Sequence, residues 1–188
     1  ARWGSRDEKV LKESIEAIRH ESGHMKYLVE QLLFLARGDS GKTRLNLEKV
    51  SLNELMEEIY EESLMIDEKH IYRFMKPTEE TLVTADSALL KQAVRILTDN
   101  ASKYTREGDE IVLSLGRTRA GEAYLQVQDM GIGMAEADVA HMFERFYRAD
   151  EVRSCQGTGL GLAIAKWIVD KHRGYFEILS RTQLGTRV

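Results

Sequence analysis

Two clusters of glycines, 24 residues apart, constrain this chain more than any other feature of its sequence. The first, Asp129-Met130-Gly131-Ile132-Gly133, places a carboxylate at the end of an apolar strand, directly before a glycine-rich turn. The second, Gly157-Thr158-Gly159-Leu160-Gly161, opens a predicted helix, where free backbone amides and the helix dipole attract anions. An adenine nucleotide requires one acidic hydrogen-bond acceptor and one amide-lined phosphate cradle. The two clusters therefore predict an ATP-binding site.

The carboxylate of Asp129 is expected on the core side of its strand, because it shares parity with Leu125 and Val127. A buried carboxylate needs a partner. The exocyclic amine of adenine is suitable, because a hydrogen bond to a charged acceptor contributes about 1.5–3 kcal/mol. The alternative is that Asp129 only stabilises the turn, since Asp is common before Gly in turns. The sequence leaves both interpretations open.

Three polar residues share one side of a predicted helix, because Asn100, Lys103 and Tyr104 lie at i, i+3 and i+4. Asn100 offers a neutral oxygen suited to Mg²⁺, which takes few protein ligands. Lys103 would meet a phosphate, and Tyr104 would stack on the base or close the core. The alternative is an ordinary helix end with a solvated lysine.

The segment between the glycine clusters contains Phe143-Glu144-Arg145-Phe146-Tyr147-Arg148, which is expected to form a short aromatic helix. Arg145 or Arg148 would reach a terminal phosphate, since a bidentate guanidinium suits phosphate oxygens. The second glycine cluster does not follow a strand, so it fits neither a dinucleotide fingerprint nor a P-loop. A flexible hinge is its alternative interpretation. The four signals are weak singly and specific in combination.

The organisation along the chain predicts three parts: a helix over residues 1–38, a polar linker over 39–46, and a domain over 47–188. The first part carries a heptad seam, which indicates a helix that packs in a bundle or dimer. In the third part we expect helices at 51–67, from 86 to about 104 and at 159–173, and strands at 71–75, 81–85, 111–115, 125–129 and 175–182. This order predicts a mixed sheet with helices on one face. The heptad seam of the first part, residues 1–38, consists of Leu11, Ile15, Ile18, Ser22, Met25, Val29, Leu32 and Ala36.

Composition limits the classes of partner and compartment. The chain has 27 basic and 31 acidic residues, a net charge of −4, and no basic stripe, so we expect no nucleic-acid partner. No apolar run approaches the roughly 18 residues that span a bilayer. The single Cys155 cannot form an internal disulfide, which favours a reducing, cytoplasmic compartment and a soluble fragment. The termini read as the middle of a longer protein, so the chain is expected to be an excerpt.

A family resemblance follows from the order of these segments. Sensor histidine kinases carry N, first glycine, F and second glycine boxes, and a last glycine box that Gly185-Thr186 resembles. The resemblance spans about residues 10–188. It implies an α+β fold, the two-layer α/β sandwich of the GHKL superfamily (the Bergerat fold), preceded by the second helix of a dimerisation hairpin. The segments that resemble the first four boxes are Asn100-x-x-Lys103-Tyr104, Asp129-x-Gly131-x-Gly133, Phe143-x-Arg145-Phe146 and Gly157-x-Gly159-x-Gly161.

The resemblance also implies roles for residues at an ATP and Mg²⁺ site. Asp129 would bind the adenine amine with help from Thr186, and Tyr104 would contact the ring. Lys103 and Arg145 would bind phosphates, Asn100 would bind Mg²⁺, and residues 134–158 would form a lid. Asn100, Lys103 and Arg145 would be the catalytic residues. The predicted nucleotide contacts are Asn100, Lys103, Tyr104, Asp129, Gly131, Gly133, Arg145, Arg148, Gly157, Thr158, Gly159, Leu160, Gly161 and Thr186.

Two departures from the family pattern shape the expected activity. Ile96 stands where the family often has an Asn, and where ATP-hydrolysing relatives have a general-base Glu; an Ile cannot activate water, which favours transfer over hydrolysis. The phosphoacceptor box, a His followed by Glu and then Pro, is missing, because the only proline is Pro77. We therefore expect this fragment to bind ATP without phosphorylating itself.

The resemblance implies the catalytic portion of a histidine kinase. It would donate the γ-phosphate of ATP to a histidine on its own dimeric hairpin, for relay to an aspartate of a response-regulator receiver domain. The full-length parent would be a homodimer anchored in the inner or plasma membrane. One alternative is a non-enzymatic, nucleotide-gated interaction module. The other is a GHKL-type ATPase.

The stretch His20-Glu21-Ser22-Gly23-His24 matches the spacing of a zinc protease signature. With Ser22 on the heptad seam, both histidines fall at outward positions, so we expect a solvated helix face. His20 as the phosphoacceptor is also disfavoured, because by the resemblance it lies on the wrong helix and Ser-Gly follows.

Overall fold

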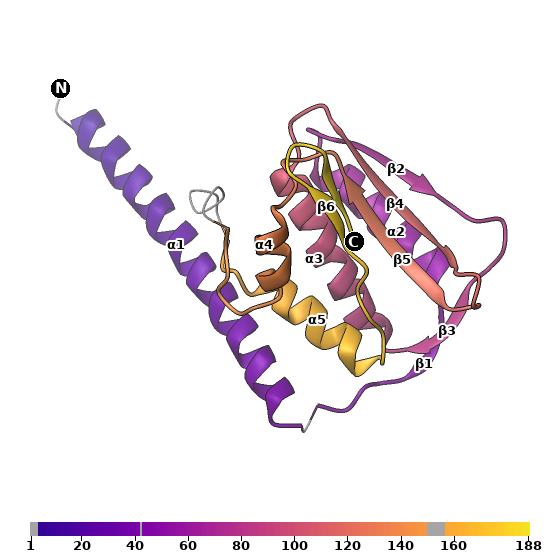
Figure 1. Ribbon diagram of the computed structural model, residues 1–188. Helices are drawn as coiled ribbons and strands as arrows, with labels where there is room; N and C mark the ends of the chain where they lie inside the picture. Colours follow the sequence, from indigo (N-terminus) through magenta and orange to yellow (C-terminus); the bar gives the residue numbers. More distant parts are fainter. Residues whose placement is uncertain (1–3, 42, 150–156) are drawn as a thin grey trace. The chain divides into compact units, whose positions relative to one another are not determined.

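The computed structural model describes residues 4–41, 43–149 and 157–188, and the chain divides into two units, residues 1–42 and 43–188. The first unit is the helix α1 (Gly4–Asp39), which runs one residue past Gly38 (Figure 1). Its predicted seam faces solvent in this chain, with Leu11, Ile15 and Ile18 each more than half exposed. An apolar stripe on a 36-residue helix indicates a surface for another helix.

The second unit contains two sheets. The smaller one pairs β1 (Glu48–Ser51) with β3 (Leu82–Ala85) in antiparallel fashion. The larger one has the strand order β2-β4-β5-β7-β6, in which β2 and β4 are parallel and the other neighbours are antiparallel. This is the mixed sheet that the element order predicts. Its strands are β2 (Ile71–Met75), β4 (Glu110–Arg117), β5 (Ala123–Asp129), β6 (Leu179–Arg181) and β7 (Gly185–Arg187).

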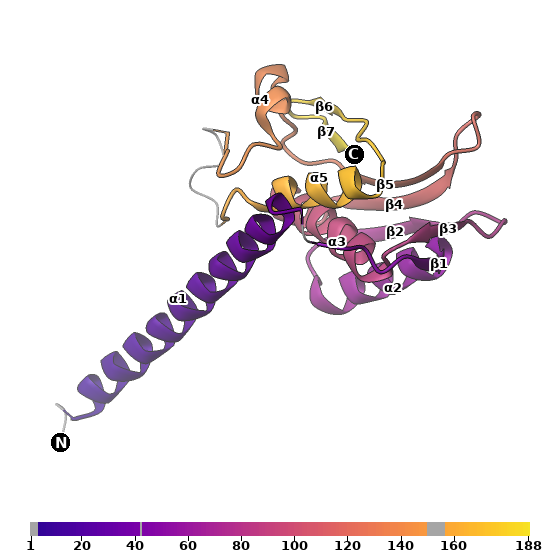
Figure 2. The same cartoon turned by 90° about the horizontal axis from the view of Figure 1, so that it is seen from below.

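Helices cover one face of the larger sheet, as Figures 1 and 2 show. The helices α2 (Leu52–Ile66) and α3 (Ser87–Tyr104) pack on the strands, and α5 (Gly161–Lys171) packs beside α3. The sheet and helices enclose a core in which alternating strand residues meet the apolar helix faces. Two layers with one core confirm the predicted α+β sandwich. The fully buried side chains of this core include Met56, Ile59, Ile111 and Leu113.

Two of the predicted helix starts, at Ser51 and Asp86, are confirmed by capping contacts. The amide of Glu54 donates to Oγ of Ser51 (3.4 Å), which begins α2. The amide of Leu89 donates to Oδ1 of Asp86 (3.1 Å), which begins α3. Each cap satisfies an amide that the first helical turn leaves without a partner. The cap at Asp86 fixes where α3 begins, and therefore which residues of α3 reach the site at its other end.

Three predicted elements were wrong in position or length. The short helix between the glycine clusters is α4 (Glu136–His141), and the aromatic segment after it is a turn in which Phe146 has a φ of 65°. The strand expected at 175–182 is reduced to β6, and Phe176 lies before this strand with its ring packed on Phe143, the centroids 4.7 Å apart. The helix expected at 159–173 covers only 161–171, since Gly159 and Arg173 at its two ends have φ angles of 70° and 59°.

The strand β1 was missed by the sequence analysis, which treated the residues before Ser51 only as the approach to a helix. Val50 of β1 pairs with Val83 of β3. In a four-residue strand, alternation is too short to distinguish from a loop.

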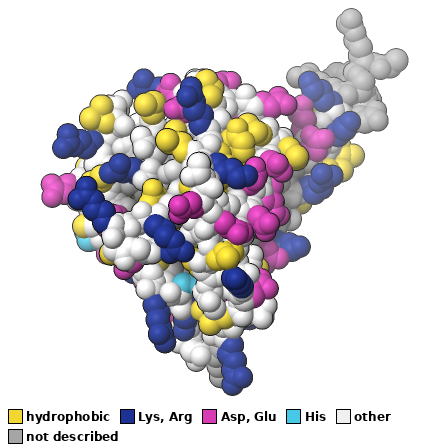
Figure 3. Space-filling model, turned by 90° about the vertical axis from the view of Figure 1, so that its right-hand side faces the viewer, with side chains coloured by type: hydrophobic (Ala, Val, Ile, Leu, Met, Phe, Trp, Pro, Cys, Tyr) yellow, Lys and Arg dark blue, Asp and Glu magenta, His cyan; other side chains and the backbone are white. Residues whose placement is uncertain are grey.

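The face of the molecule in Figure 3 carries basic, acidic and hydrophobic side chains interspersed with one another. Within the part of the chain that the structure describes, no helix is both long and apolar enough to cross a membrane.

Candidate nucleotide-binding site

The carboxylate of Asp129 ends β5 and is held by backbone amides. Its Oδ1 accepts hydrogen bonds from the amides of Gly131 (2.8 Å) and Thr186 (3.2 Å). Its Oδ2 makes no hydrogen bond with the residues that the structure describes. Burial raises the pKa of this half-buried carboxyl above its ordinary value, although the two amides act to lower it. One oxygen therefore forms the turn, and the other remains available to a ligand.

The turn after Asp129 is packed against the end of α3. The amide of Ile132 donates to the carbonyl oxygen of Tyr104 (3.1 Å). A Cβ atom at Gly131 would overlap that same carbonyl, so only glycine fits there without a shift of the backbone. Gly133 has a φ of 63° and lies against the carbonyl of Arg181 in β6. The first glycine cluster thus joins β5, α3 and β6 at one point.

The three polar residues of α3 lie at its C-terminal end. Lys103 places Nζ 5.1 Å from the ring centroid of Tyr104, and a Cβ at Gly157 would overlap that same Nζ. Its ammonium group is therefore in contact distance of the start of the second glycine cluster. Tyr104 is half-buried, so part of its side chain stays accessible. The structure brings these predicted residues together from segments more than 50 positions apart.

The second glycine cluster leads into α5. Gly159 adopts a φ of 70°, and a Cβ there would approach the Cα of Phe146 to 2.8 Å. The amide of Leu160 donates to Oγ1 of Thr158 (3.3 Å), and the Leu160 side chain is fully buried. Leu160 thus contributes its backbone alone to this loop. The helix begins at Gly161 without a side-chain cap, and uncapped amides at a helix N-terminus are suited to bind an anion.

The segment 143–148, which carries Arg145 and Arg148, contacts the second glycine cluster through its backbone. The amide of Phe146 donates to the carbonyl oxygen of Gly159 (2.8 Å), which places Arg145 and Arg148 on either side of this contact in sequence. Phe146 is 57% exposed, whereas the ring of Phe143 packs against the ring of Phe176. The remainder of the predicted lid, residues 150–156 with Cys155, lies outside the described residues.

The residues fit a single-ligand Mg²⁺ site. The side chain of Asn100 is half-buried and makes no hydrogen bond with the described part of the chain, so its oxygen is free to bind a cation. No cluster of three or more His, Cys, Asp or Glu side chains with metal-binding spacing occurs among the described residues. Mg²⁺ retains waters and uses nucleotide phosphates as ligands, so few protein ligands are required at such a site.

Sequence reasoning missed residues that support this site. Ser180 of β6 shares a hydrogen bond with Oγ1 of Thr186 (2.8 Å), and its Oγ accepts from the amide of Met134 (2.8 Å). Asp67 and His70 hydrogen-bond to the end of α3. No local pattern signals the contacts with Met134, Ser102 and Thr105, because each joins residues at least 35 positions apart. The alternation of side chains along β6 and β7 was the one sequence signal that could have identified Ser180.

Comparison with known proteins agrees with this geometry. The family described as histidine kinase-, DNA gyrase B-, and HSP90-like ATPase matches residues 85–188. The sensor histidine kinase YkoH of Bacillus subtilis is 40% identical over 196 aligned residues, covering 100% of this chain and 40% of YkoH. The sensor protein CiaH of Streptococcus pneumoniae is 38% identical over 179 residues, covering 94% of this chain and 40% of CiaH. The chain thus spans 40% of the length of both relatives.

The fold is shared with solved histidine kinase structures. The crystal structure of full-length ShkA in complex with AMPPNP superposes with a TM-score of 0.79 at 24% identity, covering 94% of this chain and 37% of that one. The predicted recognition and fold are confirmed. The chain belongs to the histidine kinase-, DNA gyrase B- and HSP90-like ATPase family, as the portion of a sensor histidine kinase that carries its ATP-binding catalytic domain.

Proposed function

We propose that Asp129 recognises the adenine amine of ATP and that the chain directs the γ-phosphate to a histidine. The observation that carries the proposal is the carboxylate of Asp129, whose Oδ1 is held by two amides while Oδ2 has no partner among the described residues. A charged acceptor held in one orientation discriminates an amine from a carbonyl, so ATP would bind and GTP would bind poorly. Tyr104 would contact the ring, and Thr186 would hold the carboxylate in place.

The phosphates would lie between the two glycine clusters. Lys103 already places its ammonium group against Gly157, and the uncapped amides of α5 begin four residues later. Arg145 and Arg148 flank the contact between Phe146 and Gly159, from where a guanidinium would bind the terminal phosphate. Three sources of positive charge would neutralise the triphosphate and position it, which is most of what phosphoryl transfer requires.

Asn100 would hold Mg²⁺, which when bound would neutralise charge on the phosphate oxygens. The half-buried amide oxygen would be its one protein ligand, and Lys103, one turn further along α3, would share the neutralisation.

Transfer to a side chain is favoured over hydrolysis by the packing of Ile96. This side chain is 9% exposed, and its Cγ2 would lie 3.3 Å from a Cβ at Gly161, the first residue of α5. An apolar group at this position supplies no base to activate water. The site would therefore hold ATP until an acceptor side chain arrives.

The remainder of the proposal concerns the whole protein. The solvent-facing apolar stripe of α1 supports its assignment, with residues 39–46 as a linker, to a dimerisation hairpin in a homodimer. A histidine on that hairpin would accept the phosphate, and the receiver domain of a response regulator would take it. ATP is supplied in the cytoplasm, so this portion would face the cytoplasm of a membrane-anchored parent.

Labelled ATP distinguishes the candidate functions. We would incubate the 188-residue chain with labelled ATP alone, and then with a separately produced hairpin that carries the phosphoacceptor histidine. We expect the wild-type chain to label the histidine of the hairpin. We expect the Asp129→Asn variant not to label it. Steady phosphate release without an acceptor would instead indicate an ATPase. ATP binding without release or labelling would indicate a nucleotide-gated module.

A further inference from the structure

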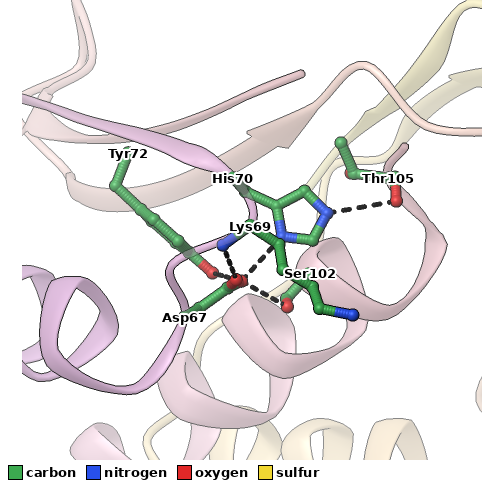
Figure 4. A network of polar contacts seen from close by, with 6 residues as sticks. All are labelled: Asp67, Lys69, His70, Tyr72, Ser102 and Thr105. Carbon is green, nitrogen blue, oxygen red and sulfur yellow. Dashed lines mark hydrogen bonds and ion pairs between the residues drawn. The ribbon is translucent and has the colours of Figure 1, made fainter. Parts of the chain in front are cut away.

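A buried polar network lies at the end of α2, outside the proposed ligand contacts (Figure 4). Asp67 follows the last residue of this helix, and its carboxylate accepts four hydrogen bonds. Three reach Oδ2, from Oγ of Ser102 (2.6 Å), Nδ1 of His70 (2.7 Å) and the hydroxyl of Tyr72 (2.9 Å). The fourth joins the amide of Lys69 to Oδ1 (2.9 Å). A buried carboxylate with this many donors is fully compensated.

The imidazole of His70 joins this carboxylate to the backbone of α3. Its Nδ1 faces Asp67, and its Nε2 lies 3.2 Å from the carbonyl oxygen of Thr105, the C-cap residue of α3. The two side chains of the pair are only 6% and 12% exposed. The two ring nitrogens thus face two oxygen atoms, the carboxylate of Asp67 on one side and the backbone carbonyl of Thr105 on the other.

The contact with Thr105 lies next to residues of the ATP site. The preceding residue, Tyr104, uses its own carbonyl oxygen to accept from the amide of Ile132 (3.1 Å). Two successive carbonyls at the end of α3 are therefore held from different directions, one by the His70 ring and one by the turn after β5. The two carbonyls belong to adjacent peptide units that meet at the Cα atom of Thr105, so holding one of them restrains the backbone that positions the other.

The turn after β5 carries this geometry to the ligand-binding carboxylate. Gly131 precedes Ile132 and donates its amide to Oδ1 of Asp129 (2.8 Å). Gly131 also lies so close to the Tyr104 carbonyl that no Cβ fits between them. The contacts are continuous from Asp67 through His70, the end of α3 and the turn to Asp129.

We propose that His70 is a positioning residue for the ATP site, holding the end of α3 so that Asp129 and Tyr104 face the adenine together. The proposal rests on the proposed role of these two residues in ATP binding. His70 itself would not touch the nucleotide. It would act by donating from Nε2 to Thr105, while its other nitrogen, held by Asp67, keeps the ring oriented.

Two substitutions separate the two contacts of His70. The amide nitrogen of Asn coincides with Nδ1 of His, and that of Gln coincides with Nε2. His70→Asn thus retains the hydrogen bond to Asp67 and loses the one to Thr105, and His70→Gln does the reverse. We expect AMPPNP to bind His70→Asn about threefold to tenfold more weakly than His70→Gln. The thermal stability of the two variants should rank in the opposite order, because Asn preserves the bond to the buried carboxylate.

Controls separate positioning from loss of stability. Tyr72→Phe removes one donor to Asp67 but leaves both contacts of His70 in place, and should lower stability while leaving AMPPNP affinity unchanged. Thr105→Val retains the backbone carbonyl and should also leave affinity unchanged. Equal affinities of His70→Asn and His70→Gln, or affinities that merely follow stability, would overturn the proposal.

A measurement on the wild-type chain does not depend on how the variants fold. The ring N–H signals of His70, followed by NMR, should shift on addition of AMPPNP, and signals that remain unchanged would overturn the proposal. The proposed function is tested separately by wild-type binding and its loss in Asp129→Asn. If those hold while the two His70 variants bind equally well, only the positioning role fails.

Discussion

The amide of Thr186 donates to Oδ1 of Asp129 over 3.2 Å, although the two residues are 57 positions apart. Register explains this contact, because Thr186 of β7 stands opposite Asp129 of β5 in the antiparallel pair. The amide of Gly131 binds the same oxygen from the turn. The carboxylate is thus oriented by two backbone groups that no side-chain substitution removes, and its second oxygen faces outward from this pair of bonds.

Asp129→Asn should abolish most ATP binding while preserving the fold. The substitution retains an oxygen for the two amides but removes the charge that would bind the adenine amine. A hydrogen bond to a charged group contributes about 1.5–3 kcal/mol, so affinity should fall about tenfold to a hundredfold. Isothermal titration calorimetry measures the affinity, and circular dichroism checks the fold. The exposed Asp170→Asn, whose partner is Lys166, is the matched control and should bind normally.

Nucleotide affinity should weaken in mild acid. Burial raises the pKa of the Asp129 carboxyl, so protonation begins at a pH above the ordinary Asp value of about 3.9. The protonated carboxyl loses acceptor strength, so the dissociation constant should rise as the pH falls toward this raised pKa. Titrations from neutral pH downward test this. Asp129→Asn should show a flatter profile, and identical profiles for both proteins would contradict the assignment.

Gly131→Ala should destabilise the second unit and weaken ATP binding together. The added methyl group would overlap the carbonyl oxygen of Tyr104, so the turn or the end of α3 must move. Overpacking of this kind costs about 1–3 kcal/mol. Chemical denaturation gives the free energy of unfolding. Gly23→Ala on α1 is the control: nothing lies within 4 Å of its Cβ position, and the exchange favours helix.

The Asp67 network should lose its stabilising effect in acid. Burial alone would raise the pKa of Asp67, but the hydrogen bonds from Ser102, His70, Lys69 and Tyr72 lower it below its ordinary value. A lowered folded-state pKa means that the contribution to stability is complete above the unfolded value of about 3.9 and is lost as the pH falls through the folded value. The difference in unfolding free energy between wild type and Asp67→Asn should therefore shrink below about pH 4. A difference independent of pH would contradict this assignment.

Thr105→Val should stabilise the protein. The Oγ1 atom of Thr105 is buried and has no hydrogen-bond partner within the described part of the chain. Val has the same branched shape without the hydroxyl, so the desolvation cost of that group disappears, a gain of about 1 kcal/mol. Thermal denaturation measures the change. Thr98→Val is the contrasting variant, since the Thr98 hydroxyl donates to the carbonyl of Val94 (2.9 Å) and its loss should not stabilise.

Local rules predicted the parts of the fold that depend on neighbours in sequence. The helix starts predicted at Ser51 and Asp86 were correct because each side chain caps an amide three positions later. The strands predicted at 111–115 and 125–129 were correct because alternation of side chains along neighbouring residues identifies a strand. Contacts from elsewhere in the chain decided the elements that were wrong. Phe146 left the predicted helix because its amide binds the carbonyl of Gly159.

The sequence by itself determined the chemistry of this protein: an acidic acceptor before a glycine turn, a cation on α3 and glycines ahead of a helix, in an order specific to one family. The tertiary structure alone decided how these groups meet. It placed Thr186 on the carboxylate of Asp129, Lys103 against Gly157, and the buried pair of Asp67 and His70 behind the end of α3. The physical reason is that residue type and local spacing set hydrogen-bonding capacity, whereas strand register and helix packing set which distant groups satisfy it.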